Sequence, residues 1–158
     1  VPIKTGIWVI TQMKEAEAVF VPIPRETTYK DGYNKQSKEL PAHFKIANGL
    51  IELARDPGKS TKIGSDASSL LWVGQKHMLK IDSPRMPNAE YPDNGSSAEV
   101  YTNLDPLQYI ELEMLGQLKE LKAGEWITQT NTYTLLRRQE KTPRAEAQKI
   151  FASNKPAR

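Results

Sequence analysis

The sequence predicts an all-β domain: an antiparallel β-sandwich with a short C-terminal helix. Apolar and polar residues alternate with period two in several runs, as in half-buried strands. Gly, Pro and Asn separate those runs, and only one segment carries the start signals of a helix. The chain has 158 residues, of which 38% are hydrophobic, which is enough for one domain with a buried core.

The N-terminal third predicts two hairpins joined by a long loop. Residues 6–13 and 16–23 are β-rich runs separated by a short polar break, which indicates the first hairpin. Residues 24–41 are polar and contain Gly and Pro, so we expect a loop of the length that often binds ligands. Residues 43–56 predict the second hairpin, because Asn48-Gly49 is a strong two-residue turn signal.

The rest of the chain predicts further strands and one helix. A second long loop, with three prolines, is expected over residues 83–97. Thr142 is a candidate N-cap, and Pro143 suits the first position of the helix that follows. Strands are expected within residues 60–82, 98–103, 108–115 and 125–138.

Basic residues are concentrated at the C-terminal end. From Leu136 onward there are seven basic and two acidic residues, which leaves 15 basic and 17 acidic residues in the remainder. We therefore expect a β-sandwich domain over residues 1–138 and a solvated, partly disordered basic tail with a short helix over residues 139–158. Nucleic-acid binding is not expected, because a binding surface would combine basic residues with several aromatics, and the tail contains only one aromatic, Phe151.

Several function classes are excluded by what the sequence lacks. There is no Cys, so disulfides and thiol catalysis are excluded, and a periplasmic or secreted location is compatible with this composition. No apolar run is long enough to span a membrane. His43 and His77 lie 34 positions apart, without metal-ligand spacing, so neither a metal nor another cofactor is expected. The stretch 56–61, DPGKST, lacks the first glycine of a phosphate-binding loop.

The stretch 108–115, QYIELEML, places two carboxylates on one face of a strand. Glu111 and Glu113 alternate with apolar residues, and Tyr109 shares their face. In the preceding strand, Glu99 and Tyr101 point away from the apolar side. The connection between the two strands is short, so we expect them to be antiparallel neighbours with all five side chains on one surface.

Such a surface suits a carbohydrate ligand. Carboxylates accept paired hydrogen bonds from neighbouring hydroxyls, and aromatic rings cover the C–H face of a sugar. Neighbouring carboxylates also raise one another's proton affinity, as acid–base catalysis requires. The alternative is an ordinary solvent-facing sheet, which often carries Glu and Tyr.

The C-terminal strands also resemble a known superfamily. The stretch 109–136, YIELEMLGQLKELKAGEWITQTNTYTLL, has a Glu-bearing strand, a Leu-x-x-Gly-Glu turn and a Thr-rich final strand. Together with the preceding YPDNGSSAEVYTN, it is similar to the C-terminal end of galactose mutarotase-like (aldose 1-epimerase-like) domains, most of all to an uncharacterised bacterial branch.

The resemblance implies a supersandwich fold, whole or in part, and an isomerase in which a Glu takes a proton from the sugar and a His donates one. Glu111 or Glu113 would be the base, and His77 or else His43 the acid. We expect Trp72 to be a stacking platform for the sugar. The alternative is a non-catalytic structural or interaction domain of a larger polysaccharide-handling protein.

Half of a supersandwich would leave sheet edges and apolar surface exposed. We therefore expect either that an N-terminal portion is missing or that the chain forms a homodimer.

Overall fold

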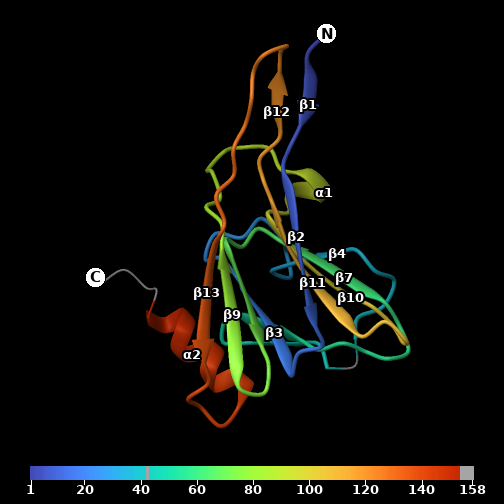
Figure 1. Ribbon diagram of the computed structural model, residues 1–158, viewed down its shortest axis with the longest axis vertical. Helices are drawn as coiled ribbons and strands as arrows, with labels where there is room; N and C mark the ends of the chain where they lie inside the picture. Colours follow the sequence, from blue (N-terminus) through green and yellow to red (C-terminus); the bar gives the residue numbers. More distant parts are fainter. Residues whose placement is uncertain (42, 154–158) are drawn as a thin grey trace.

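The computed structural model describes residues 1–41 and 43–153 and confirms the all-β prediction. Strands make up 42% of the chain and helices 9%, and every strand pair is antiparallel. Two sheets pack face to face, and a two-stranded ribbon projects beyond them at the top of Figure 1. No helix in the described ranges is long and apolar enough to cross a bilayer.

The two sheets have five and six strands. In spatial order, the five-stranded sheet contains β2 (Trp8–Lys14), β11 (Tyr109–Leu115), β10 (Ala98–Thr102), β7 (Thr61–Ser65) and β4 (Asn34–Lys35). The six-stranded sheet contains β13 (Thr132–Arg137), β9 (His77–Asp82), β8 (Ser69–Val73), β3 (Ala18–Pro22), β6 (Leu50–Leu53) and β5 (Lys45–Ala47). The ribbon consists of β1 (Ile3–Thr5) and β12 (Lys119–Leu121).

The core lies between the two sheets and consists of the apolar residues that alternate with polar ones along the strands. Val100 and Leu112 project inward from the five-stranded sheet, and Val19, Leu70 and Ile81 from the six-stranded sheet; all five are fully buried. Because successive side chains of a strand alternate between its faces, the glutamates and tyrosines of β10 and β11 must point outward.

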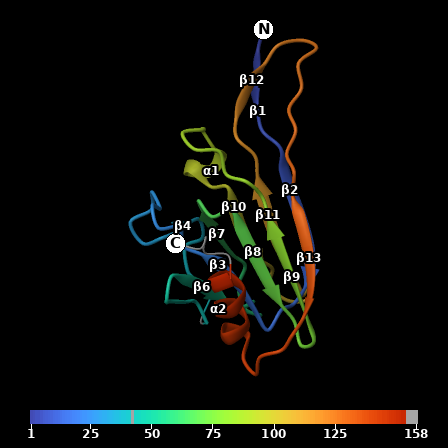
Figure 2. The same ribbon diagram turned by 90° about the vertical axis from the view of Figure 1, so that its left-hand side faces the viewer.

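The helix α2 (Pro143–Ser153) packs on the outer face of the six-stranded sheet, as Figure 2 shows. Ala147 is fully buried against Phe20 and its neighbours, and Arg144 donates to Glu52 over 2.6 Å. The predicted N-cap is present, since Thr142 Oγ1 accepts the N–H of Ala145 at 3.2 Å. The expectation of a solvated tail is therefore wrong for the helix; residues 154–158 lie outside the described part.

The second predicted hairpin is confirmed and the first is wrong. β5 and β6 pair across Asn48 and Gly49, whose positive φ values of 53° and 71° suit a two-residue hairpin turn. In contrast, β2 pairs with β11, while β3 pairs with β6 and β8, so the chain crosses from one sheet to the other. β3 is buried on both faces, between the core and α2, and it therefore takes a central position in the other sheet.

Two smaller differences concern the predicted strand 125–138 and the predicted loop 83–97. Only residues 132–137 of the former form a strand. The loop contains a short turn, α1 (Pro92–Gly95), in which Asp93 and Asn94 have positive φ values of 47° and 60°. This turn lies beside the start of β10.

Candidate functional site

The acidic residues predicted to share a surface do lie on the outer face of the five-stranded sheet. β10 and β11 are antiparallel neighbours, with Glu99 opposite Glu113 and Tyr101 opposite Glu111. The core-facing residues of both strands are buried, so these four side chains project away from the core. The local pattern therefore predicted this arrangement correctly.

A lysine from the next strand joins the two carboxylates. Lys62 in β7 places its Nζ 2.7 Å from Glu99 and 3.2 Å from Glu113. Each glutamate is only 1% exposed. Gln36 Nε2 donates to Glu99 over 2.5 Å, and Trp8 Nε1 donates to Glu113 over 2.8 Å. We call these five residues the Lys62 cluster.

Gly64 makes the close approach of the polar loop possible. It lies opposite Glu99 in the β7–β10 register and opposite Asn34 in the β4–β7 register. A Cβ on Gly64 would overlap Ser96 Oγ and come within 2.9 Å of Gln36 Nε2. Without a side chain at Gly64, Gln36 can lie over the sheet and reach Glu99.

The long loop before β4 is fastened at its start as well. The buried Asp66 accepts hydrogen bonds from Thr27 Oγ1 at 2.8 Å and from the backbone N–H of Thr28 at 2.8 Å. Tyr29 donates to the carbonyl of Asn94 over 3.0 Å. These hydrogen bonds hold the loop in a fixed position at one side of the Lys62 cluster.

Burial and ion pairing have opposite effects on the pKa values of the charged groups in the cluster. Burial raises the pKa of Glu99, and the hydrogen bonds from Lys62 and Gln36 only partly offset it. Burial likewise raises the pKa of Glu113 more than Lys62 and Trp8 lower it. Burial opposes the charge of Lys62, but its two carboxylate partners outweigh that effect and raise the pKa of this amine. The cluster therefore binds protons more readily than separate, solvated groups would.

Trp8 is the exposed member of the cluster. Its indole N–H is held by Glu113, and Lys62 Nζ lies 4.5 Å from the centre of its ring. The residue is nevertheless 47% exposed. Its exposed ring is therefore held in a fixed orientation on the outer face.

Glu111 lies further along the same face and is half-buried. It faces Gln12 of β2 and Tyr101 of β10, and its carboxylate forms no hydrogen bond or ion pair within residues 1–41 and 43–153. The ring of Tyr109 lies 6.2 Å from that of Tyr101. This end of the face therefore offers a free carboxylate beside an amide and two phenols.

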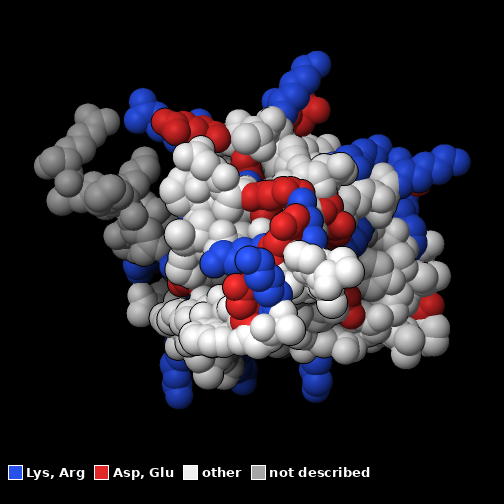
Figure 3. Space-filling model, turned by 90° about the horizontal axis from the view of Figure 1, so that it is seen from above, with Lys and Arg blue, Asp and Glu red and all other residues white. Residues whose placement is uncertain are grey.

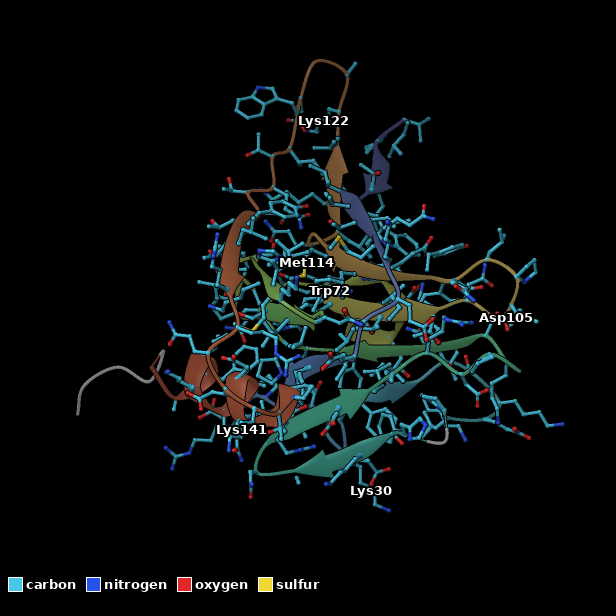
Figure 4. All side chains as sticks on the ribbon, turned by 60° about the horizontal axis from the view of Figure 1, so that its bottom comes forward. Lys30, Trp72, Asp105, Met114, Lys122 and Lys141 are labelled. Atoms are coloured by element: carbon cyan, nitrogen blue, oxygen red, sulfur yellow. The ribbon has the colours of Figure 1, made fainter. Side chains whose placement is uncertain are left out.

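Trp72 and His77 are not brought to this surface. Both belong to the six-stranded sheet: Trp72 packs against the core, and its indole N–H donates to the carbonyl of Lys14 over 2.9 Å. In the view of Figure 4, Trp72 appears in the middle of the molecule. His77 is exposed at the start of β9, and His43 is exposed beside β5. The five-stranded sheet therefore separates Trp72 and His77 from the glutamates, and the tryptophan that contacts them is Trp8.

The sequence reasoning missed Lys62, Gln36 and Trp8. The alternation in residues 61–65 puts Lys62 on one face of a strand, but that strand begins 37 positions before β10. Nothing local says that β7 and β10 pair or that the long loop reaches back over them. The exposed side of Trp8 likewise depends on which sheet β2 joins.

The described residues contain no group of three or more His, Cys, Asp or Glu side chains placed to hold a metal ion. The face in Figure 3 carries acidic and basic side chains close together, without the broad basic area that a phosphate backbone attracts. The side chains of the Lys62 cluster can supply hydrogen bonding, aromatic stacking and proton exchange by carboxylates.

Comparison of the chain with protein-family models, with curated proteins and with solved structures gives no significant match.

Proposed function

We propose that the outer face of the five-stranded sheet binds a carbohydrate, with the sugar ring stacked on Trp8. The observation that carries the proposal is the state of this indole, which is 47% exposed and yet fixed by a 2.8 Å hydrogen bond to Glu113. Holding the ring in place before binding reduces the side-chain entropy that the protein loses when a ligand binds.

Polar groups further along the same face from Trp8 complement the hydroxyls of a sugar chain. Glu111 accepts hydrogen bonds, and Gln12, opposite it in the β2–β11 register, both donates and accepts them. The two tyrosines at the end of the face add a further aromatic surface. Glu113 and Glu99 contribute indirectly, because they are buried and fix Trp8, Lys62 and Gln36.

Binding fits this geometry better than catalysis of the epimerase type. An epimerase needs a proton donor opposite its carboxylate base, within hydrogen-bond reach of the same sugar. His77 and His43 lie on other parts of the fold, and Glu113 is already engaged by Trp8 and Lys62. We therefore propose binding without a histidine-dependent proton transfer.

The test is a screen of mono- and oligosaccharides by glycan array, followed by calorimetry on the ligands found. Trp8→Ala is expected to weaken binding at least about tenfold, or about 1.4 kcal/mol, because a stacked aromatic is typically a binding hot spot. Glu111→Gln is expected to weaken it as well, with an unchanged melting temperature.

Trp126→Ala is the matched control, since Trp126 is 77% exposed in the segment after the projecting ribbon. It is expected to leave the affinity unchanged. Absence of binding across the panel, or equal binding by wild type and Trp8→Ala, would contradict the proposal. The interaction-domain alternative would then be favoured.

A further inference from the structure

Both sheets end, on one side of the sandwich, in a strand with a free edge. β2 pairs only with β11, and β13 pairs only with β9, among the strands that the structure describes. Tyr133 of β13 and Thr11 of β2 share a hydrogen bond of 2.9 Å between their side-chain hydroxyls. Figure 2 shows the two strands running side by side. One side of the molecule therefore presents two rows of unpaired backbone groups.

The opposite side has the protection that natural edge strands usually carry. Its edge strands, β4 and β5, have only two and three residues, and each contains a lysine, Lys35 or Lys45. Short length and charge both discourage pairing with another chain. β2 and β13 are longer, with seven and six residues, and each carries its one charged residue, Lys14 or Arg137, at its last position.

Large apolar side chains are exposed along the same unprotected strands. Ile10 is 52% exposed on β2, and Leu135 is 73% exposed on β13, next to the 47% exposed Tyr133. A long edge strand with exposed apolar residues and no charge before its last residue favours association with a further strand. Because both edges lie on the same side of the sandwich, we expect a partner that pairs with both sheets at once.

We propose that this partner is a second copy of the chain, which pairs β2 with β2 and β13 with β13. A two-fold axis perpendicular to a sheet always makes an edge strand antiparallel to its copy. The hydrogen bond between Thr11 and Tyr133 places the edges of β2 and β13 next to one another in the two layers. A single two-fold axis that is perpendicular to both sheets and passes beside this bond can therefore pair each of the two strands with its own copy.

The charges at the strand ends agree with self-pairing. Thr11 is the central residue of β2, so an axis there places Lys14 opposite Trp8 of the copy. Lys14 then lies opposite an uncharged residue instead of a like charge. The resulting sheets have ten and twelve strands, and their only remaining edges are the short, lysine-bearing β4 and β5.

The experiment is light scattering over a concentration series, with hydrogen exchange of the backbone amides at low and high concentration. The wild-type chain is expected to have twice its 17.8 kDa mass at high concentration. Amide exchange in β2 and β13 is expected to slow as the dimer forms, with no change in β4 and β5. Ile10→Lys combined with Leu135→Lys is expected to abolish the dimer, since each edge strand then carries a charge within its length, which discourages strand pairing.

The matched control is Ile46→Lys, a change at a 43% exposed position of β5, which is expected to leave the dimer intact. A mass of 17.8 kDa at every concentration would overturn the proposal. So would a dimer that survives the double substitution, or a mass that keeps growing beyond two copies. Should the double variant fail to fold, the exchange of wild-type β2 and β13 amides decides the matter alone, and an exchange rate independent of concentration overturns the proposal.

Discussion

Replacing Lys62 by methionine removes the cation that two buried carboxylates share. Glu99 and Glu113 are each 1% exposed and stand opposite one another in adjacent strands. Methionine keeps most of the length and apolar volume of the lysine stem, so the change is largely electrostatic. Breaking a buried ion pair by removal of one partner typically costs about 3–5 kcal/mol, because the remaining charge is uncompensated.

Protonation of one glutamate limits this cost. Two carboxylates without a cation between them can share a proton, as carboxylate pairs do. A glutamate with the ordinary pKa of 4.5 is ionised at pH 7. Keeping it protonated at that pH costs about 3.4 kcal/mol, since each pH unit above the pKa costs about 1.36 kcal/mol. At pH 5 the same proton costs about 0.7 kcal/mol. Lys62→Met is therefore expected to lower the free energy of unfolding by about 3 kcal/mol at pH 7 and by less than about 1 kcal/mol at pH 5.

The pH dependence has a definite sign. In the folded variant the glutamate pair has a pKa above the ordinary value, so between pH 5 and pH 7 it binds more protons than the unfolded chain does. Stability then falls as the pH rises, relative to the wild type.

Urea unfolding at the two pH values measures both free energies, and Lys4→Met is the control. Lys4 pairs with Glu90 across 2.6 Å, but both side chains are about half exposed, so its loss is expected to cost at most about 1 kcal/mol. Adding Glu99→Gln to Lys62→Met is expected to restore most of the stability at pH 7. Equal destabilisation at pH 5 and pH 7 would refute this account, because the loss would then come from packing.

Two further predictions concern the packing around the site and under the helix. Gly64→Ala is expected to cost about 1–3 kcal/mol in urea unfolding, because the new Cβ would overlap Ser96 Oγ; Gly58→Ala, with its nearest atom 3.4 Å away, is the control and is expected to cost less than about 1 kcal/mol. Ala147→Asp is expected to cost about 3 kcal/mol or more, because it buries an unpaired charge between α2 and the sheet, whereas Gln148→Asp on the exposed side of the helix should change stability by about 0.5 kcal/mol or less. Faster cleavage within α2 by a protease, seen only for the change at Ala147, would support this mechanism, and equal cleavage of both variants would contradict it.

The sequence alone determined the local features. Period-two alternation fixes which residues of a strand share a face, and this places Glu99, Tyr101, Glu111 and Glu113 on one surface once β10 and β11 pair. That pairing could be predicted because a short connection joins the two strands. The turn before β6 and the start of α2 were also predictable, because turn and cap signals involve only a few neighbouring residues.

The tertiary structure decided which strands meet and which groups are buried. Lys62, Gln36 and Trp8 reach the glutamates from segments tens of residues away, and Trp72 and His77 belong to the other sheet. Alternation gives the faces of a strand but not its sheet, since any half-buried strand presents the same pattern to every candidate neighbour. Burial of the carboxylates, and with it their raised proton affinity, exists only after distant strands and the long loop have packed together.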